Sequence, residues 1–192
     1  MPSPELAAAL PVKTLRLAIE VAWLAFWVYW LISAVNAKQG SGRGLIGRMP
    51  GVTAIVTLII VTHIFKTNST AVHVLILQLL GSAMFLAGIG LAVWARVHLG
   101  RNWGMPMTLK DEPELVTSGP YRFIRHPIYS GILLALLGTA IATNIYWLIV
   151  LVVMACYFIY SARTEERLMA SSFPDSYRSY KSRTKMLIPF VL

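Results

Sequence analysis

Two polar stretches in an otherwise apolar chain carry the residue types that could do chemistry. The first, residues 96–127, ends with Arg125-His126-Pro127. Pro127 suits the first position of a helix, where its missing N–H costs nothing. The free amide groups of that helix start, next to Arg125 and His126, would attract an anion. In the alternative interpretation, these basic residues only anchor the helix to lipid headgroups.

The second stretch, residues 163–192, opens with the acidic pair Glu165-Glu166. Carboxylates at the C-terminal end of a helix oppose its dipole, so the pair needs a physical reason to be there. In one interpretation, Arg163 and Arg167 simply neutralise the pair. In the other, one Glu turns inward, toward the basic helix start or a polar ligand.

The last part of the second stretch is basic and aromatic. Tyr177 and Tyr180 are three residues apart, so they share one face of a helix. Such a segment would lie on the membrane surface or cap a pocket.

Metal and nucleic-acid sites have little support in the sequence. The single cysteine, Cys156, lies in an apolar run, and His63 and His73 have no carboxylate at ligand spacing, so no metal centre is expected. The net charge of +9 would suggest nucleic acid in a soluble protein. Here it bears on membrane orientation instead, and no nucleic-acid partner is expected.

The elements that must position these residues are membrane-spanning helices. Of the 192 residues, 57% are hydrophobic and only 13% are charged, so lipid must be part of the solvent. Spans of about 20 apolar residues must be helical, because lipid offers no partners to backbone N–H and C=O groups. Five segments qualify, at residues 15–35, 52–65, 71–95, 128–142 and 146–162. We therefore predict an all-α membrane protein whose last two spans form a helical hairpin.

The helices are expected to form one membrane domain over residues 1–192, with three spans in residues 1–95 and a catalytic half in residues 96–192. Small residues in the third span would let helices approach closely; they are Ala83, Ala87, Gly88 and Ala92.

Basic residues predict the orientation of these spans. Fourteen of the 17 Lys and Arg residues fall on one side of the five-span topology, and Lys13, Arg16 and Lys66 fall on the other. The basic side is expected to be cytosolic, which leaves the N-terminus outside and the C-terminus inside. In an alternative interpretation, residues 15–35 are a signal peptide that is cleaved after Ala37.

In its two polar stretches the chain resembles the isoprenylcysteine carboxyl methyltransferases and the related phospholipid N-methyltransferases, which are membrane enzymes. The resemblance rests on residues 115–131, with the pattern Arg-His-Pro-x-Tyr-x-Gly, and on Glu165-Glu166 after the helical hairpin. Further matches are Phe173, Tyr177, Tyr180 and Ile188-Pro189. The likeness covers roughly residues 99–190, and the acidic pair makes the motif specific.

The resemblance implies S-adenosylmethionine as methyl donor, held without a Rossmann domain in a cytosolic pocket between residues 96–127 and the C-terminal segment. It implies a lipophilic or prenylated acceptor from the bilayer, with carboxyl O-methylation of an isoprenylcysteine as the first expectation. The implied cofactor contacts are Leu115, Val116, Tyr121, His126, Pro127, Tyr129 and Glu165. As catalytic residues we expect Arg125 or Arg163, which would orient an acidic headgroup, and Glu166, or alternatively His126, which would take a proton from an amine.

One position departs from the family pattern. The eukaryotic carboxyl methyltransferases carry an Arg four residues before the Glu that matches Glu165, and this chain has Ser161 there. An amine acceptor, as in phospholipid N-methylation, is therefore the alternative. The third possibility is an NADPH-dependent membrane reductase with a similar motif, or a membrane protein that is no enzyme.

Overall fold

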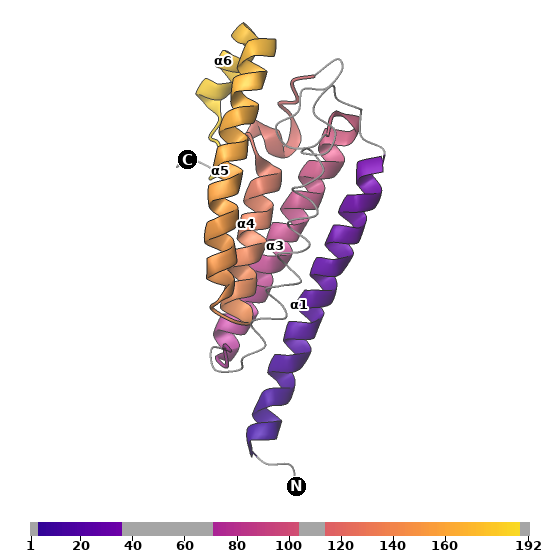
Figure 1. The fold of residues 1–192 in the computed structure, drawn as a ribbon, viewed down its shortest axis with the longest axis vertical. Coiled ribbons are helices and arrows are strands. Elements are labelled where there is room, and N and C mark those ends of the chain that lie inside the picture. Colours follow the sequence, from indigo (N-terminus) through magenta and orange to yellow (C-terminus); the bar gives the residue numbers. More distant parts are fainter. Residues whose placement is uncertain (1–3, 36–70, 104–113, 189–192) are drawn as a thin grey trace.

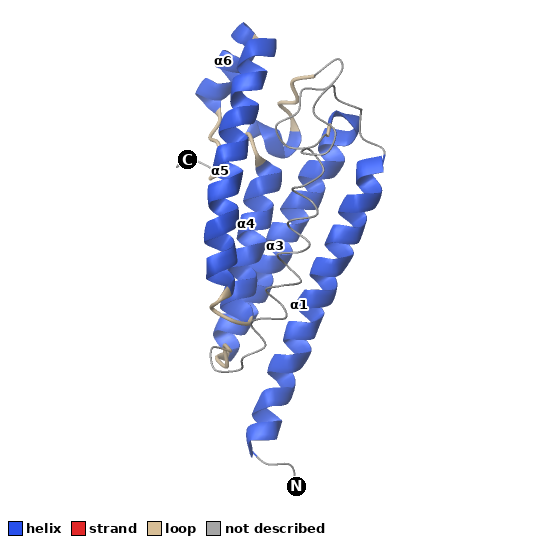
Figure 2. Ribbon diagram, viewed as in Figure 1, coloured by secondary structure: helices blue, strands red, loops and turns tan. Residues whose placement is uncertain are grey.

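The computed structural model describes residues 4–35, 71–103 and 114–188, and the regular elements in these ranges are helices (Figures 1 and 2). The long helices are α1 (Pro4–Val35), α3 (Leu75–Leu99), α4 (Pro127–Ala142), α5 (Trp147–Ser172) and α6 (Pro174–Arg183). Two short 3-10 turns, η2 (Gly100–Asn102) and η3 (Gly119–Arg122), accompany them. The span predicted at residues 52–65 lies outside the described residues.

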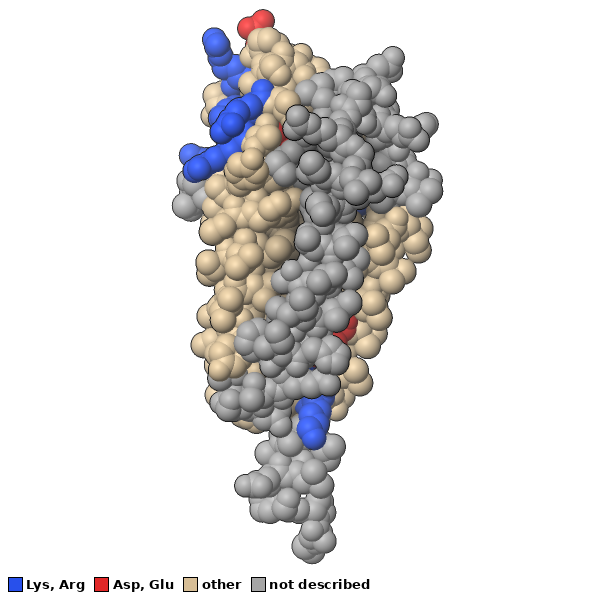
Figure 3. Space-filling model, viewed as in Figure 1, with Lys and Arg blue, Asp and Glu red and all other residues tan. Residues whose placement is uncertain are grey.

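The predicted all-helical membrane fold is confirmed. Among the described residues, α1, α3 and α5 are long and apolar enough to cross a membrane, and α4 is a shorter apolar helix. On the face drawn in Figure 3, Lys and Arg side chains gather at the end that carries α6 and, in smaller number, at the opposite end. Between these ends, the described residues on this face carry few charged side chains, as expected where lipid surrounds a protein.

The bounds of two helices differ from the prediction. The helix expected at residues 71–95 begins only at Leu75, because the preceding backbone is extended and the N–H of Val72 donates to the carbonyl of Thr143 at 3.0 Å. The helix expected at residues 146–162 continues to Ser172, well beyond its apolar run. The acidic pair therefore lies on the helix itself, and not on a connection that follows it.

The hairpin of α4 and α5 is confirmed, and α3 packs tightly against α4 (Figure 1). Gly81 and Gly88 on α3 meet Gly138 and Gly131 on α4, so closely that a Cβ added at Gly88 would lie 2.4 Å from the backbone nitrogen of Ala135. Backbones approach this closely only where side chains are absent. The predicted contact at Gly88 is thus confirmed.

The rest of the predicted small-residue face is partly wrong. Ala83 and Ala87 are exposed, whereas Ala92 is fully buried. The contact face of α3 follows glycines seven residues apart, and the four-residue spacing placed two alanines on the outer side of the helix.

Helix α1 joins this bundle through its aromatic side chains. The indole Nε1 of Trp23 donates to the hydroxyl of Thr139 on α4 at 3.1 Å, and its ring contacts Phe85 of α3 edge-on, with 5.6 Å between centroids. At the end of α1, the guanidinium of Arg96 donates to the carbonyl of Ser33 at 2.6 Å and covers the ring of Trp103. The helices therefore form one bundle whose α4–α5 hairpin carries the polar residues at one end.

Candidate functional site

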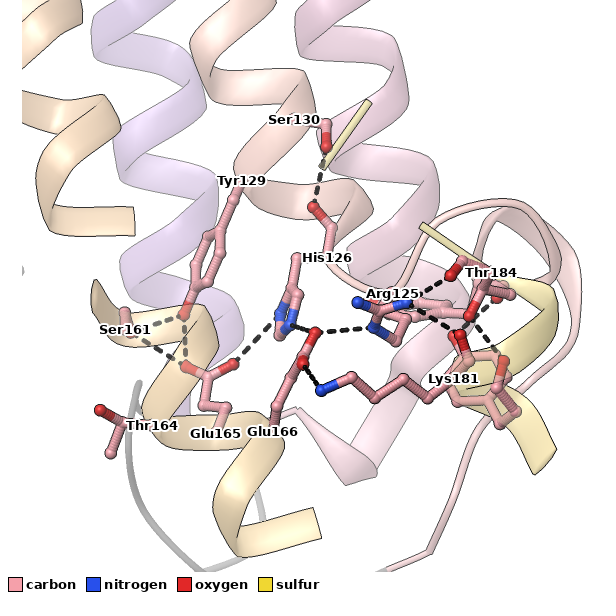
Figure 4. Close-up of polar contacts among 12 residues, drawn as sticks. Arg125, His126, Tyr129, Ser130, Ser161, Thr164, Glu165, Glu166, Lys181 and Thr184 are labelled. Atoms are coloured by element: carbon pink, nitrogen blue, oxygen red, sulfur yellow. Dashed lines mark hydrogen bonds and ion pairs between the residues drawn. The ribbon is translucent and has the colours of Figure 1, made fainter. Parts of the chain in front are cut away.

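The start of α4 and the polar end of α5 meet because the two helices are antiparallel neighbours. Pro127 is the first residue of α4, as predicted, and His126 is the residue before the helix. In α5, Ser161 and Glu165 are one helical turn apart and face α4, next to Glu166. The predicted meeting of the Arg125-His126 segment with the acidic pair is therefore confirmed (Figure 4).

Glu166 is the centre of a buried charge cluster. Its carboxylate accepts from Nε of Arg125 at 2.6 Å and from Nζ of Lys181 at 2.7 Å. The side chains of Arg125 and Glu166 are only 9% and 7% exposed, so this pair is screened little by water. Lys181 is 53% exposed and belongs to α6, so the cluster also ties that helix to α5.

Arg125 also holds the end of α6 and the backbone that follows. Its Nη1 donates to the carbonyls of Lys181 and Thr184, while its backbone N–H donates to the carbonyl of Lys185 at 2.8 Å. The backbone N–H of His126 donates in turn to Met186 at 3.1 Å. These bonds make the C-terminal segment a strap over the start of α4, and they occupy much of the donor capacity of Arg125.

His126 lies between the two carboxylates. Its Nδ1 is 3.5 Å from Oε2 of Glu165, and its Nε2 is 3.6 Å from Oε1 of Glu166. These are ion-pair separations, and Nε2 is buried without a hydrogen-bond partner among the described residues. Burial lowers the pKa of His126, but the neighbouring carboxylates of Glu165 and Glu166 outweigh it, and the pKa is raised above its ordinary value.

Glu165 has a different environment, made of hydroxyl groups. It accepts hydrogen bonds from the hydroxyls of Tyr129 and Ser161, which are themselves 3.1 Å apart. The ring of Tyr129 stacks between His126 and Phe158, with centroid distances of 5.5 and 4.4 Å. This stack fixes the ring, so the carboxylate of Glu165 is held in one place at 26% exposure.

Tyr121 connects the site to the 3-10 turn before α4. It is buried, its backbone carbonyl accepts from the hydroxyl of Tyr180 at 2.7 Å, and its own hydroxyl reaches the carbonyl of Ala95. Burial and the nearby groups Tyr180 and Glu165 raise the pKa of Tyr121, so its hydroxyl stays protonated. The turn itself begins at Gly119, which has a positive φ of 58° and which, because it lacks a Cβ, leaves room for the ring of His98.

The structure brings most of the predicted site residues together, whereas Arg163 lies apart from them. Arg125, His126, Tyr129, Glu165 and Glu166 form the cluster, at whose helix start Pro127 is fully buried. Leu115 and Val116 are half-buried, and Val116 packs against the hydrophobic core. Arg163 is exposed, on a different face of α5 from Ser161 and Glu165. The role predicted for Arg163 stays a prediction, without support from its position.

Sequence reasoning did not assign a role to Lys181, Thr184 or Phe158. Lys181 pairs with Glu166 only because α6 folds back beside the end of α5, and no local pattern reports that return. Phe158 could have been found, since it lies seven residues before Glu165 and so near the same face of one helix.

Comparisons with known proteins identify a family for this chain. The family model described as phospholipid methyltransferase matches residues 76–176. The protein-S-isoprenylcysteine O-methyltransferase of Schizosaccharomyces pombe is 34% identical over 101 residues, which are 50% of this chain and 43% of that protein. The cobalt-zinc-cadmium resistance protein CzcN of Cupriavidus metallidurans is 32% identical over 140 residues, which are 70% of this chain and 60% of that protein.

A solved structure shares the fold. The eukaryotic intramembrane Ras methyltransferase, an isoprenylcysteine carboxyl methyltransferase, superposes with a TM-score of 0.56 at 23% identity, over 78% of this chain and 54% of that one. The chain thus spans about half the length of that structure and of the yeast relative. Because the family model covers more than half of the chain, this protein belongs to the phospholipid methyltransferase family.

Proposed function

We propose that this protein transfers a methyl group from S-adenosylmethionine to a lipophilic acceptor that enters from the bilayer. The observation that carries the proposal is the convergence of His126, Tyr129 and Glu165 at one end of the α4–α5 hairpin. That end is the basic one, so we place the site on the cytosolic side, with the N-terminus outside. The carboxyl of an isoprenylcysteine is the first candidate acceptor, because isoprenylcysteine O-methyltransferases are among the relatives.

The residues present fit the charges of S-adenosylmethionine. The carboxylate of Glu165, which is held by neutral hydroxyls and is partly exposed, suits an ammonium group. The first amides of α4 suit a carboxylate. The face of Tyr129 suits a sulfonium. Leu115, Val116, Tyr121 and Pro127 complete the proposed pocket.

When bound there, the cofactor would supply a methyl group that its sulfonium already makes electrophilic. The chain then has to position the acceptor and exclude water. The stacked rings around Tyr129 and the strap over the start of α4 provide rigid walls for this purpose. A carboxylate acceptor needs no base at neutral pH, because its pKa is about 4.

An amine acceptor is the second candidate, and Ser161 favours it. The hydroxyl of Ser161 is fully buried and bonded to Tyr129 and Glu165, where an Arg would offer a cation to a carboxylate. An ammonium must lose a proton before it attacks. Glu166 is bound by two cations and is thus a poor base, so His126 in its neutral form is the better candidate.

Calorimetric titration of the purified protein in detergent tests the proposal. We expect micromolar binding of S-adenosylmethionine, no binding of NADPH, and at least tenfold weaker S-adenosylmethionine binding in Glu165→Gln, since one charge-assisted contact is worth about 1.5–3 kcal/mol. Asp175→Asn is the matched control, because Asp175 is an exposed carboxylate on the neighbouring helix α6. Binding of NADPH alone would favour a reductase, and unchanged affinity in Glu165→Gln would remove Glu165 from the site.

A further inference from the structure

Tyr157 on α5 has a buried hydroxyl that the arrangement described above does not use. This hydroxyl has no hydrogen-bond partner among the described residues, although water cannot reach it there. The ring is half-buried against the core and lies 5.7 Å from the ring of Phe158, the outer member of the aromatic stack. An unpaired buried hydroxyl is unfavourable, and in native proteins it calls for an explanation such as an absent ligand.

Its place on α5 relates it to the acidic pair. Tyr157, Ser161 and Glu165 follow one another at intervals of four residues, so they lie along one face of the helix. Tyr157 is two turns further from the polar end, about 12 Å along the helix axis on the bilayer side of Glu165. A molecule that entered from the lipid would therefore pass the depth of this hydroxyl before it reached Glu165.

The neighbouring tyrosine shows that the burial of this hydroxyl is specific to its face. Tyr160 is 63% exposed on another side of the same helix, as expected for a lipid-facing residue. Along the face of Tyr157, Ser161 is fully buried, and its hydroxyl is already engaged by Tyr129 and Glu165. Along this face, Tyr157 thus keeps a buried donor that no described residue accepts.

We propose that the hydroxyl of Tyr157 donates a hydrogen bond to a headgroup oxygen of the lipophilic acceptor and so selects acceptors that carry oxygen beside the methylated atom. Both a carboxyl group and the phosphate next to a phospholipid amine offer such an oxygen. A simple alkanethiol does not, because sulfur is a weak acceptor. Tyr157 is in this view a specificity-determining residue, and the inference rests on the proposed function.

The test compares Tyr157→Phe with Tyr160→Phe, which removes the same atom from the lipid-facing side. Labelled methyl transfer is measured in detergent micelles with S-farnesylcysteine, phosphatidylethanolamine and dodecanethiol as acceptors. We expect wild type to methylate an oxygen-bearing acceptor, and Tyr157→Phe to lower kcat/KM for it about tenfold, the worth of one buried hydrogen bond. Binding of S-adenosylmethionine should not change, and Tyr160→Phe should resemble wild type.

A second readout separates this role from a structural one. Because the hydroxyl lacks a partner in the free protein, Tyr157→Phe should melt at the same temperature as wild type or higher. A lower melting temperature or an unchanged kcat/KM in Tyr157→Phe would overturn the inference. It would also be overturned if wild type methylated dodecanethiol alone, or none of the three acceptors. If wild type binds no S-adenosylmethionine, the proposed function itself fails; if wild type is active and the variant equals it, only this inference fails.

Discussion

Replacing Glu166 by Gln should destabilise the protein and weaken the attachment of the C-terminal segment to the helical hairpin. The carboxylate holds Arg125 at 2.6 Å, and both side chains are less than one-tenth exposed. Removing one partner of a buried ion pair costs about 3–5 kcal/mol, because the other charge stays buried without compensation. Gln keeps one oxygen that can accept from Arg125, so we expect the lower end, about 3 kcal/mol of unfolding free energy.

Lys181→Gln is the matched control for this prediction. It removes the second cation from the same carboxylate, but Lys181 is 53% exposed and its pair with Glu166 is therefore screened by water. We expect a loss of less than about 1 kcal/mol. The difference in unfolding free energy between the two variants thus measures the contribution of the buried pair of Arg125 and Glu166.

Unfolding by sodium dodecyl sulfate in decyl maltoside micelles, followed by circular dichroism, gives the two free energies. Hydrogen exchange adds a local measurement, because the amides of Arg125 and His126 donate to the carbonyls of Lys185 and Met186. Both amides should exchange faster in Glu166→Gln than in Lys181→Gln. Equal stability of the two variants, within about 0.5 kcal/mol, would refute the assignment of Glu166 as the centre of a buried cluster.

Two further predictions concern His126 and the glycine contact. The pKa of His126 is raised in the folded protein, so its stabilising charge is fully present below the unfolded pKa of about 6.5 and is lost as pH rises through the folded value. The melting temperature should therefore fall more steeply as the pH rises above about 6.5 in wild type than in His126→Gln, and parallel curves would exclude this linkage. Gly88→Ala would bring a Cβ within 2.5 Å of the carbonyl oxygen of Gly131 and should cost about 3 kcal/mol in the same unfolding assay, whereas Gly90→Ala, with no atom within 4 Å, should cost nothing. A tolerated Gly88→Ala would show that α3 and α4 do not pack this closely.

The contact between Arg125 and Glu166 could be predicted from the sequence because it follows from topology. Pro127 marks the start of one helix, and the short connection after residue 142 forces the next helix to return to the same membrane face. A basic helix start and an acidic helix end must then lie close together. This reasoning needs no side-chain detail, and the distances in the cluster bear it out.

The length of α5 and the position of α6 could not be predicted in the same way. The apolar run ends at Ala162, but residues 163–172 include Glu, Arg, Leu, Met and Ala, which favour a helix in water as well. Hydropathy reports where lipid ends and not where a helix ends. The return of α6 depends on the turn at Phe173-Pro174 and on Arg125, whose guanidinium reaches the carbonyls at its end.

The two adjacent carboxylates have different surroundings because neighbouring residues on a helix point roughly 100° apart. Glu166 faces Arg125 and Lys181, and its charge therefore serves to hold the fold. Glu165 faces the hydroxyls of α4 and α5, keeps 26% exposure, and has His126 as a cationic neighbour. Loss of the Glu166 charge should therefore appear in stability, while loss of the Glu165 charge should appear in cofactor binding. If both variants failed in the same assay, the acidic pair would be one structural unit, and the site would have to be sought elsewhere on the hairpin.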